Sequence, residues 1–386
     1  MNRIELGRLV QQPQGFKAFI PGDFPPAKEI DFSLSIIKKH TEAVRLLGKL
    51  DGITELLPDK DCFLQMFMMK DASSSSQIEG TNATMNDAIE AENIDRKPNL
   101  PTDVDDILHY IKALNYGMER AKEFPFTLRF IKELHHRLLN GARTTGNAFP
   151  GEFRRSQNWI GGTRPDNARF VPPPVHEMHK ALSDLENFIH ADDGYLPLIK
   201  AALLHSQFET IHPFVDGNGR TGRMLITMFL WFEKLLEMPV LYLSAYFKKH
   251  QDVYYERING YHDGDVGNWV EFFLDAVIET AKSSISTCQR IIGIRTNDMM
   301  KVQQLSQKAS ASTMKVLMGL YKMPIVGIAD VVKWTGFSNK GAYNLIDRMV
   351  EMKILVPLKP NNGVVYGQKW SYKDYLESFS NDSGGS

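Results

Sequence analysis

The stretch HPFVDGNGRTGR, from His212 to Arg223, places a titratable base, a carboxylate, an amide, glycines and two arginines within twelve residues. Apolar residues then recur every three or four positions up to Leu235, which predicts a helix that begins directly after the glycines. Gly217 and Gly219 can adopt backbone angles that other residues avoid, so the loop around them can present a row of N–H donors. The dipole of the following helix adds to their attraction for an anion. The stretch therefore predicts an anion site with a proton acceptor beside it.

The charged residues of this stretch suit a polyphosphate. Arg220 and Arg223 lie three positions apart on the expected helix and carry no neighbouring carboxylate in sequence except Asp216, so both can offer forked donors to a ligand. A lone carboxylate beside bound phosphates suits Mg²⁺, whose other ligands are water and phosphate oxygens. His212 titrates near neutral pH and can take a proton from a hydroxyl. Fragments of the stretch fit an ordinary helix start with a core histidine and surface ion pairs equally well.

The whole stretch resembles the signature of Fic-domain proteins, His-x-Phe-x-Asp/Glu-Gly-Asn-Gly-Arg-x-x-Arg, and matches every defined position. Members that resemble this chain are protein adenylyltransferases, which move AMP from ATP to a Ser, Thr or Tyr hydroxyl and release pyrophosphate. The resemblance implies that His212 is the general base and Asp216 the Mg²⁺ ligand. It also assigns ATP binding, with the γ-phosphate at the last residue, to Gly217, Asn218, Gly219, Arg220, Thr221, Gly222 and Arg223.

A second motif, DASSSSQIEG from Asp71 to Gly80, ends an apolar stretch and predicts the C-terminal end of a helix. A serine run before a glycine is ordinarily a solvated helix end. Ser75-x-x-x-Glu79-Gly80 nevertheless resembles the inhibitory motif of Fic proteins, in which a helix outside the core projects a glutamate into the phosphate site. The resemblance implies that Glu79 pairs with Arg223 and repels the γ-phosphate. This arrangement is typical of the class with an N-terminal inhibitory helix.

Helical spacing recurs along most of the chain and predicts a mainly α fold. The predicted helices cover residues 32–50, 60–79, 103–123, 127–140, 175–190 and 197–210, then the motif helix and one from about 268. His205, on the face that leads to His212, is expected to be a packing residue. Residues 157–174 break the helical pattern and predict a hairpin, although a surface loop fits equally. In Fic proteins the equivalent hairpin is a flap that pairs with the target by strand addition.

Adenine recognition is assigned by the resemblance alone. Tyr246, Tyr254 and Tyr255 lie within one segment after the motif helix, and an aromatic ring can stack on a base. The sequence distance from His212 selects Tyr254. Three tyrosines so close together also fit a packed core.

The residues after 313 predict helices at 314–321 and 326–335, a third helix capped by Ser338, and a hairpin over 354–370 with its turn at Asn361-Asn362-Gly363. This order resembles a winged helix, a module that often binds DNA. From Lys301 to Ser386, eleven Lys and Arg exceed six Asp and Glu, a net of +5. Because Asp347 and Glu351 lie on the third helix and repel phosphates, DNA binding ranks behind target docking or dimerisation.

These motifs divide the chain into an N-terminal helical region (1–100) with the inhibitory motif Ser75 to Gly80, a Fic core (101–295) with a short β-hairpin flap, a linker or helix end (296–312), a winged-helix-like domain (313–375) and a disordered tail (376–386). The 386 residues are 43% hydrophobic, with a net charge of −1 that argues against bulk capture of nucleic acid or membrane. The two cysteines have no metal-site spacing, and the sequence predicts no membrane segment. We expect a cytoplasmic protein.

The leading hypothesis is an ATP- and Mg²⁺-dependent protein adenylyltransferase that Glu79 restrains. One alternative is a DNA-binding regulator whose Fic core senses a nucleotide, and another is a Fic enzyme that removes AMP or uses another nucleotide. The expected partner is a protein hydroxyl docked on the 157–174 flap, with self-modification and a homodimer as further expectations.

Overall fold

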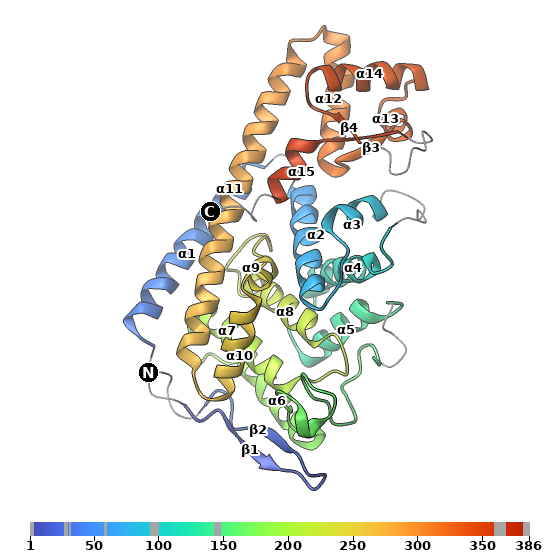
Figure 1. The fold of residues 1–386 in the computed structure, drawn as a ribbon. Helices are drawn as coiled ribbons and strands as arrows, with labels where there is room; N and C mark the ends of the chain where they lie inside the picture. Colours follow the sequence, from blue (N-terminus) through green and yellow to red (C-terminus); the bar gives the residue numbers. More distant parts are fainter. Residues whose placement is uncertain are drawn as a thin grey trace.

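The computed structural model describes residues 4–26, 30, 32–57, 60–92, 100–142, 148–358 and 368–380. The fold is mainly helical, as the sequence predicts (Figure 1). The helices before the motif are α1 (Leu34–Thr54), α2 (Lys60–Ile78), α3 (Met85–Glu92), α4 (Val104–Ala121), α5 (Leu128–Leu139), α6 (Val175–His190) and α7 (Pro197–Ile211). The helices that follow are α8 (Asn218–Phe232), α9 (Ser244–Lys249), α10 (Gln251–His262), α11 (Val266–Gln303), α12 (Gln307–Lys322), α13 (Ile328–Thr335), α14 (Asn339–Glu351) and α15 (Lys373–Ser380).

The centre of the fold is α7, which is buried on all sides from Leu198 to Ile211. Helix α7 packs against α6, α8, α10 and α11. Its polar residues, Glu209 among them, are therefore buried together with its apolar ones. Its start follows local chemistry, since Pro197 occupies the first turn, where the missing N–H costs nothing. The bend between α7 and α8 therefore lies in the interior of the molecule.

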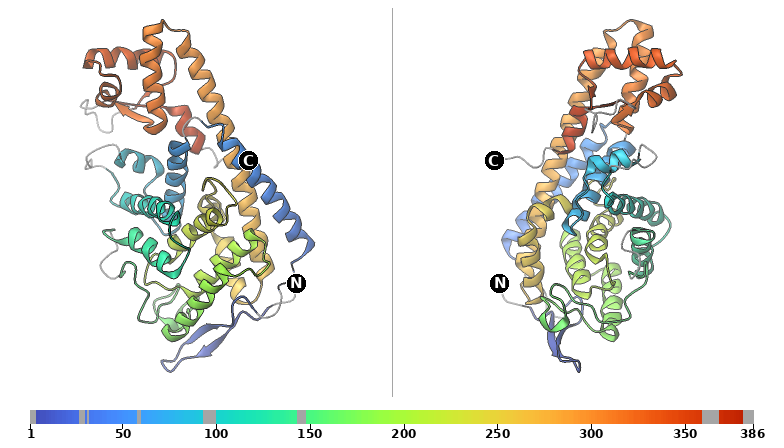
Figure 2. Two further views of the ribbon diagram at one scale, coloured as in Figure 1. Left: turned by 180° about the vertical axis from the view of Figure 1, so that it is seen from behind. Right: turned by 45° about the vertical axis from the view of Figure 1, so that its right-hand side comes forward.

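Helix α11 runs beside α1 along one side of the molecule and connects the core to the C-terminal elements (Figures 1 and 2). It continues to Gln303, and α12 begins at Gln307, so most of the expected linker at 296–312 is helical. The buried residues Ile291 and Val302 keep this end of α11 packed. The hydroxyl of Tyr372 also donates to Asp298 at 2.7 Å.

The C-terminal elements follow the order α12, β3 (Ile325–Gly327), α13, α14, β4 (Val356–Pro357), β5 (Lys369–Ser371) and α15. The antiparallel sheet has the order β3-β5-β4, with Val356 opposite Ser371. Ser338 caps α14 as expected, because its Oγ accepts from the Gly341 N–H at 3.3 Å. The predicted turn at residues 361–363 lies outside the described residues. This order is compatible with a winged helix, which stays a prediction.

The predicted disordered tail is wrong for residues 376–380, which form the last turns of α15. Tyr375 and Phe379 lie four positions apart and are both 1% exposed. The Phe379 ring packs on Phe63 and Phe67 of α2, with ring centroids 6.1 and 5.5 Å apart. Burial of this apolar face orders the helix. Residues 381–386 lie outside the described part of the chain.

The N-terminal hairpin of β1 (Gly7–Gln11) and β2 (Lys17–Pro21) is a feature that the sequence did not predict, like α3, α9 and α10. Its strand β2 touches the expected flap, since the Phe19 N–H donates to the Val171 carbonyl at 2.9 Å. The flap itself has a single antiparallel bridge, between Ile160 and Phe170, and a short 3₁₀ turn (η2, Pro165–Asn167) near its tip. The predicted hairpin at 157–174 is therefore present in reduced form.

Within the described residues, no helix combines the length and the apolar character that a bilayer span requires.

Candidate active site

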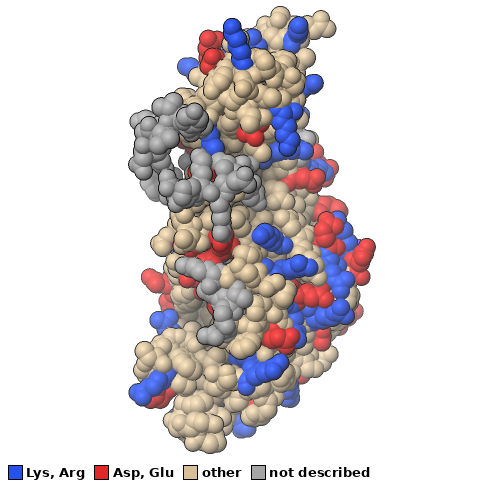
Figure 3. Space-filling view, turned by 90° about the vertical axis from the view of Figure 1, so that its right-hand side faces the viewer, with Lys and Arg blue, Asp and Glu red and all other residues tan. Residues whose placement is uncertain are grey.

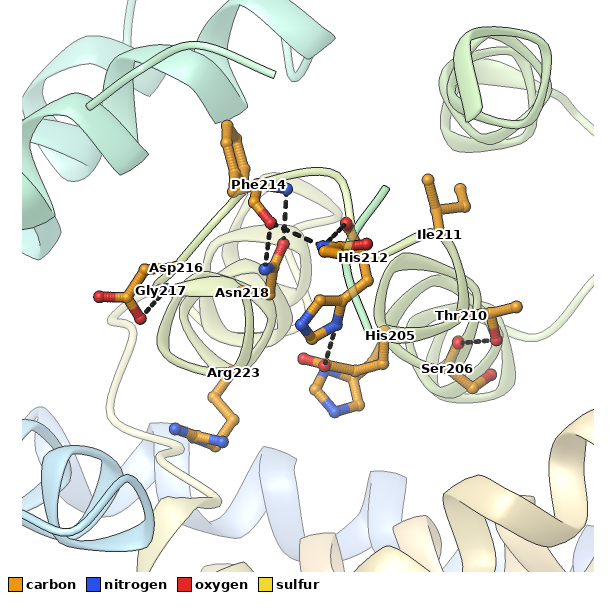
Figure 4. A network of polar contacts seen from close by, with 12 residues as sticks. His205, Ser206, Thr210, Ile211, His212, Phe214, Asp216, Gly217, Asn218 and Arg223 are labelled. Carbon is orange, nitrogen blue, oxygen red and sulfur yellow. Dashed lines mark hydrogen bonds and ion pairs between the residues drawn. The ribbon is translucent and has the colours of Figure 1, made fainter. Parts of the chain in front are cut away.

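His212 ends α7 in the left-handed conformation, with φ 48°. A residue with a Cβ adopts this conformation at a cost, so the surroundings must hold it. Its carbonyl accepts from Nε of Arg154 at 3.0 Å and from Nδ2 of Asn158 at 3.1 Å. The resulting bend separates α7 from α8 and directs the imidazole between the two helices (Figure 4).

The loop that follows is closed by the side chain of Asn218. Its Oδ1 accepts from the Phe214 N–H at 2.9 Å, and its Nδ2 donates to the Phe214 carbonyl at 2.8 Å (Figure 4). The His135 ring stacks on Phe214 at 3.6 Å, and its Nε2 lies 2.9 Å from the Asp216 carbonyl oxygen. The Asn218 side chain thus shapes the loop, and the contact it can still offer a nucleotide is its backbone N–H.

The two glycines of the loop serve different purposes. Gly217 is left-handed, with φ 76°, as the sequence predicts, whereas Gly219 already lies in α8. The expectation of unusual backbone angles is therefore wrong for Gly219. A Cβ at that position would clash with the carboxylate of Glu79 and would lie 3.0 Å from Nη1 of Arg223. A glycine is needed at position 219 because any larger residue would occupy the space of the Glu79 carboxylate.

Arg223 makes the contact that the inhibitory motif implies. Its Nη2 lies 2.7 Å from Oε1 of Glu79 and 3.0 Å from the Ser75 carbonyl, and its Nε donates to Oγ of Ser75 at 2.9 Å. The Arg223 side chain is 2% exposed and that of Glu79 is 39% exposed. Burial alone would lower the pKa of Arg223, but the nearby carboxylate of Glu79 reverses the effect and raises it. One guanidinium nitrogen, and not a fork of two, binds the carboxylate.

The position of α2, which directly precedes Glu79, is fixed by contacts of Asp71 with two other helices. The buried carboxylate of Asp71 accepts from the Tyr110 hydroxyl of α4 at 2.9 Å and from the Ser244 N–H of α9 at 3.1 Å. Burial raises the pKa of Asp71, and these hydrogen bonds oppose the shift. Helix α2 ends at Ile78, and Glu79 and Gly80, the latter with φ 92°, form the turn that follows it.

Arg220 lies near Asp216, the exception that the sequence allowed, and near a second carboxylate that the sequence did not predict. Its Nη2 lies 3.7 Å from Oδ1 of Asp216, and its Nη1 lies 4.0 Å from Oδ1 of Asp106 in α4. Asp106 is more than one hundred positions away in sequence, so its approach to Arg220 is a product of the fold. The side chain of Arg220 is 6% exposed and faces the loop from inside.

Thr221 and Gly222, which the resemblance assigns to the nucleotide-binding run, both face the interior. Thr221 is fully buried, and a Cβ on Gly222 would meet Glu209, Phe208 and His205 of α7. Because α8 turns both residues toward α7, only their backbone groups could meet a nucleotide, and the assignment stays a prediction. Both residues lie where α8 packs closely against α7.

Asp216 carries the single carboxylate of the loop and points away from His212 (Figure 4). Its side chain is 43% exposed, and its Oδ1 accepts from the Gly217 N–H at 2.6 Å. Among the described residues no group of three or more His, Cys, Asp or Glu side chains could hold a metal ion by itself. One open carboxylate beside N–H donors fits Mg²⁺, which binds through few protein oxygens together with phosphate and water.

Tyr254 is a core residue whose ring has no free face in this structure, and its stacking on adenine stays a prediction that the burial does not favour. It is 2% exposed, and its hydroxyl lies 2.9 Å from Nε2 of His205. Its ring packs on Phe247, with centroids 4.7 Å apart. The packing role expected of His205 agrees with its complete burial. Tyr255, the next residue, is half-buried and keeps an accessible face.

Glu209 is a residue that sequence reasoning missed. It lies one helical turn before His212, and its Oε2 is 3.8 Å from Nδ1 of the imidazole. Burial raises the pKa of Glu209 to about 7, the guanidinium of Arg223 opposes this shift, and Glu79 adds to it. The spacing of three residues from His212 on one helix was the available signal.

The protonation state of the His212 imidazole suits a general base. Burial and the cation of Arg154 lower its pKa to about 4, while the Glu209 carbonyl and the carboxylates of Glu79 and Asp216 act in the opposite direction. The side chain of His212 is 19% exposed. The imidazole is therefore neutral at physiological pH and can accept a proton from a group that reaches it.

Comparisons with known proteins agree with this geometry. The model of the Fic/DOC family matches residues 125–230, and that of the Fic/DOC family N-terminal region matches residues 37–119. Proteins named "Protein adenylyltransferase Fic" from Culex quinquefasciatus and Aedes aegypti are each 31% identical over 175 residues, 44% of this chain and 31% of theirs. The chain thus matches about a third of the length of these curated relatives.

A solved structure of a Fic family protein from Desulfovibrio desulfuricans has the same fold. Its TM-score is 0.59 at 18% sequence identity, and the match covers 89% of this chain and 97% of that one. This likeness extends beyond the motif to most of the helices. The two family models match separate segments, residues 125–230, which contain His212, and residues 37–119, which contain Glu79, so the chain is similar to Fic/DOC proteins over these segments.

Proposed function

We propose that the chain is a protein adenylyltransferase that moves AMP from ATP to a Ser, Thr or Tyr hydroxyl of a protein. The observation that carries the proposal is the buried guanidinium of Arg223 in the first turns of α8, with the neutral base His212 at the bend before that helix. The names of the insect relatives support the same reaction.

The phosphates of ATP would lie at the start of α8. The first intrahelical bond there runs from the Thr221 N–H to the Gly217 carbonyl at 2.9 Å, so the N–H groups of the preceding turn are available. Anions bind at such helix N-termini. Arg220 and Arg223 add forked donors, and Arg223 would bind the γ-phosphate once Glu79 releases it.

The transfer step uses His212 as general base. The hydroxyl oxygen of the target forms a bond to the α-phosphorus, the bond from that phosphorus to the bridging oxygen breaks, and pyrophosphate leaves. The hydroxyl proton goes to Nε2 of His212. Asp216 would hold Mg²⁺, which supplies neutralisation of the phosphate charge. The protein contributes mainly position and charge, as nucleotidyl transfer requires.

Glu79 would restrain this reaction by occupying the γ-phosphate position. Its carboxylate lies against Gly219 and binds Nη2 of Arg223 at 2.7 Å. A γ-phosphate brought to the same guanidinium would lose this donor and meet a like charge. We therefore propose that ATP binds the wild-type chain in an unproductive pose.

The test is incubation of purified protein with α-labelled ATP, Mg²⁺ and a cell lysate. Glu79→Gly should label itself and lysate proteins well above wild type, and His212→Ala in the same background should label neither. Glu119→Gly, which removes a surface glutamate that is 75% exposed, is the matched control. Absence of label with Glu79→Gly would remove the transferase proposal. Loss of AMP from a previously modified protein would instead support AMP removal.

The target segment is proposed to dock between the flap and the N-terminal hairpin. A cavity of about 990 Å³ there is lined by β1, β2, flap residues and His262. The Phe170 ring of the flap stacks on His262 at 3.9 Å, so the flap strand is held firmly. An extended peptide can add to such a strand. Arg169→Glu, at this cavity, should lower labelling of lysate proteins more than self-labelling.

The C-terminal elements are proposed to form a winged-helix-like unit that docks a protein or a second copy of the chain. Helix α14 carries Lys340 and Arg348, but Asp347 and Glu351 lie on it as well. On the face in Figure 3, basic and acidic side chains are interspersed. A salt-dependent gel shift on duplex DNA, without AMP transfer, would favour a DNA-binding regulator.

We also propose that the protein works in the cytoplasm. The thiols of Cys62 and Cys288 are both free, which suits a reducing compartment.

A further inference from the structure

The carboxyl group of Glu209 is buried, and no hydrogen bond to its Oε1 compensates for the loss of water. The residue is 8% exposed, and within the described part of the chain its Oε1 has no hydrogen-bond partner. A buried polar group in this state costs free energy, so it calls for a reason. The imidazole of His212 lies close to this carboxyl group, with Nδ1 3.8 Å from Oε2.

The interface between α7 and α8 leaves room for this carboxyl group. Any Cβ on Gly222 would clash with Oε1 of Glu209 and would lie 3.1 Å from the Phe208 ring. The glycine therefore opens a space on α8 that the carboxyl group fills. An apolar side chain would fill the same space without the cost of burying a polar group. The packing alone does not explain why the residue is a glutamate.

The charged and titratable groups around Glu209 come from different parts of the fold. They are Glu79 just after α2, His205 of α7 and its C-cap His212, Arg223 of α8, and Tyr254 and Tyr255 of α10. Arg223 favours the ionised carboxylate, whereas burial and Glu79 favour the protonated carboxyl group, and the pKa of Glu209 is raised to about 7. The group therefore changes charge near neutral pH, directly beside the base.

Nδ1 of His212 faces two oxygens of Glu209, the peptide carbonyl, which raises the pKa of the imidazole, and the carboxylate at 3.8 Å, which is too far for a hydrogen bond in this structure. The carbonyl favours the tautomer with the proton on Nδ1, which leaves the Nε2 lone pair for the substrate. When Nε2 takes the hydroxyl proton, the ring becomes a cation, and a carboxylate on its far side lowers the free energy of that cation. Hydrogen bonds that are long in a free enzyme can shorten in the reacting complex.

We propose that Glu209 is a positioning residue that supplies the counter-charge for His212 while it holds the proton of the acceptor hydroxyl. The inference rests on the proposed function. No proton passes to Glu209 in this step, because the hydroxyl proton stays on Nε2 and the Nδ1 proton stays in place. Glu209 acts through the imidazole and touches neither ATP nor the target.

The activity test uses Glu209→Gln and Glu209→Ala in the Glu79→Gly background. Both should lower kcat at pH 8 by about 10- to 100-fold, the usual effect of removing an orienting partner, with the KM for ATP within about twofold. Removal of Glu79 lowers the pKa of Glu209 from about 7, because Glu79 raises it in the wild-type chain. Since the carboxylate forms only above that lowered pKa, kcat of the parent should rise with pH over a range below pH 7. The Gln variant should lack this rise, so the two proteins should converge at the acidic end of the profile. Ser206→Ala, a buried change in the same helix, should keep the rise.

A second measurement does not depend on transfer activity. In the wild-type chain, the ¹⁵N shifts of the His212 ring should report a step near pH 7 as Glu209 ionises, and Glu209→Gln should abolish it. A step that persists in Glu209→Gln, or a pH profile equal to that of the parent, would overturn the proposal. If the Glu79→Gly protein transfers no AMP at all, the proposed function fails, and the ring titration still decides the pairing of Glu209 with His212.

Discussion

Replacing Glu79 by Gln tests the restraint on Arg223 quantitatively. The change keeps the size of the side chain and an oxygen that can accept from Nη2 of Arg223, but it removes the charge. A hydrogen bond to a charged group contributes about 1.5–3 kcal/mol. Because Glu79 is 39% exposed, the lower end of this range applies. About 1.4 kcal/mol corresponds to a tenfold change in an equilibrium.

The expected result is therefore a rise of about tenfold in the initial rate of self-labelling at ATP concentrations below saturation. The rate for Glu79→Gly should be higher still, because that change also clears the space against Gly219. The assay is the initial incorporation of α-labelled AMP, with Glu119→Gln as the matched control and a thermal melt of each variant. If Glu79→Gln folds normally and labels at the wild-type rate, the carboxylate of Glu79 does not restrain Arg223.

Three further predictions concern single positions. His212→Ala should lower transfer by about 10²–10⁴-fold in the Glu79→Gly background, while calorimetry should still detect ATP binding, since no phosphate contact is lost. Phe379→Ala should lower the free energy of unfolding by about 3–5 kcal/mol, measured by chemical denaturation, because a ring that is 1% exposed leaves a cavity against α2. Tyr255→Ala should raise the KM for ATP more than Tyr254→Phe, because only the Tyr255 ring keeps an accessible face. Equal changes in KM for the two variants would contradict a position of adenine beside Tyr255.

The residues that could be predicted from sequence belong to one local stretch. The bend at His212, the left-handed Gly217 and the start of α8 follow from residue types within a few positions of each other. The contact of Glu79 with Arg223 spans 144 positions, and no local rule predicts it. This contact was predicted from the resemblance of Ser75-x-x-x-Glu79-Gly80 to a family motif.

The residues that escaped prediction act through the tertiary fold. Arg154 and Asn158 hold the His212 carbonyl from a segment with no helical or strand pattern, and His135 reaches the loop from α5. Tyr254 was selected by its distance along the chain, which does not specify the side of α10 that faces the core. Only the packing of α10 against α7 and α11 decides that its ring is buried.

The glycines of the motif connect the base to the restraint. Gly219 admits the carboxylate of Glu79 on one side of α8, and Gly222 admits the carboxyl group of Glu209 on the side that faces α7. Arg223 lies within electrostatic range of both acids, and each acid affects the other through the pKa of Glu209. Departure of Glu79 would lower that pKa and favour the carboxylate beside His212. Because Glu79 itself raises the pKa of His212, its departure also removes that charge, and the newly ionised Glu209 would take over its role beside the imidazole. Release of the restraint and this exchange of counter-charge would then be two results of a single movement.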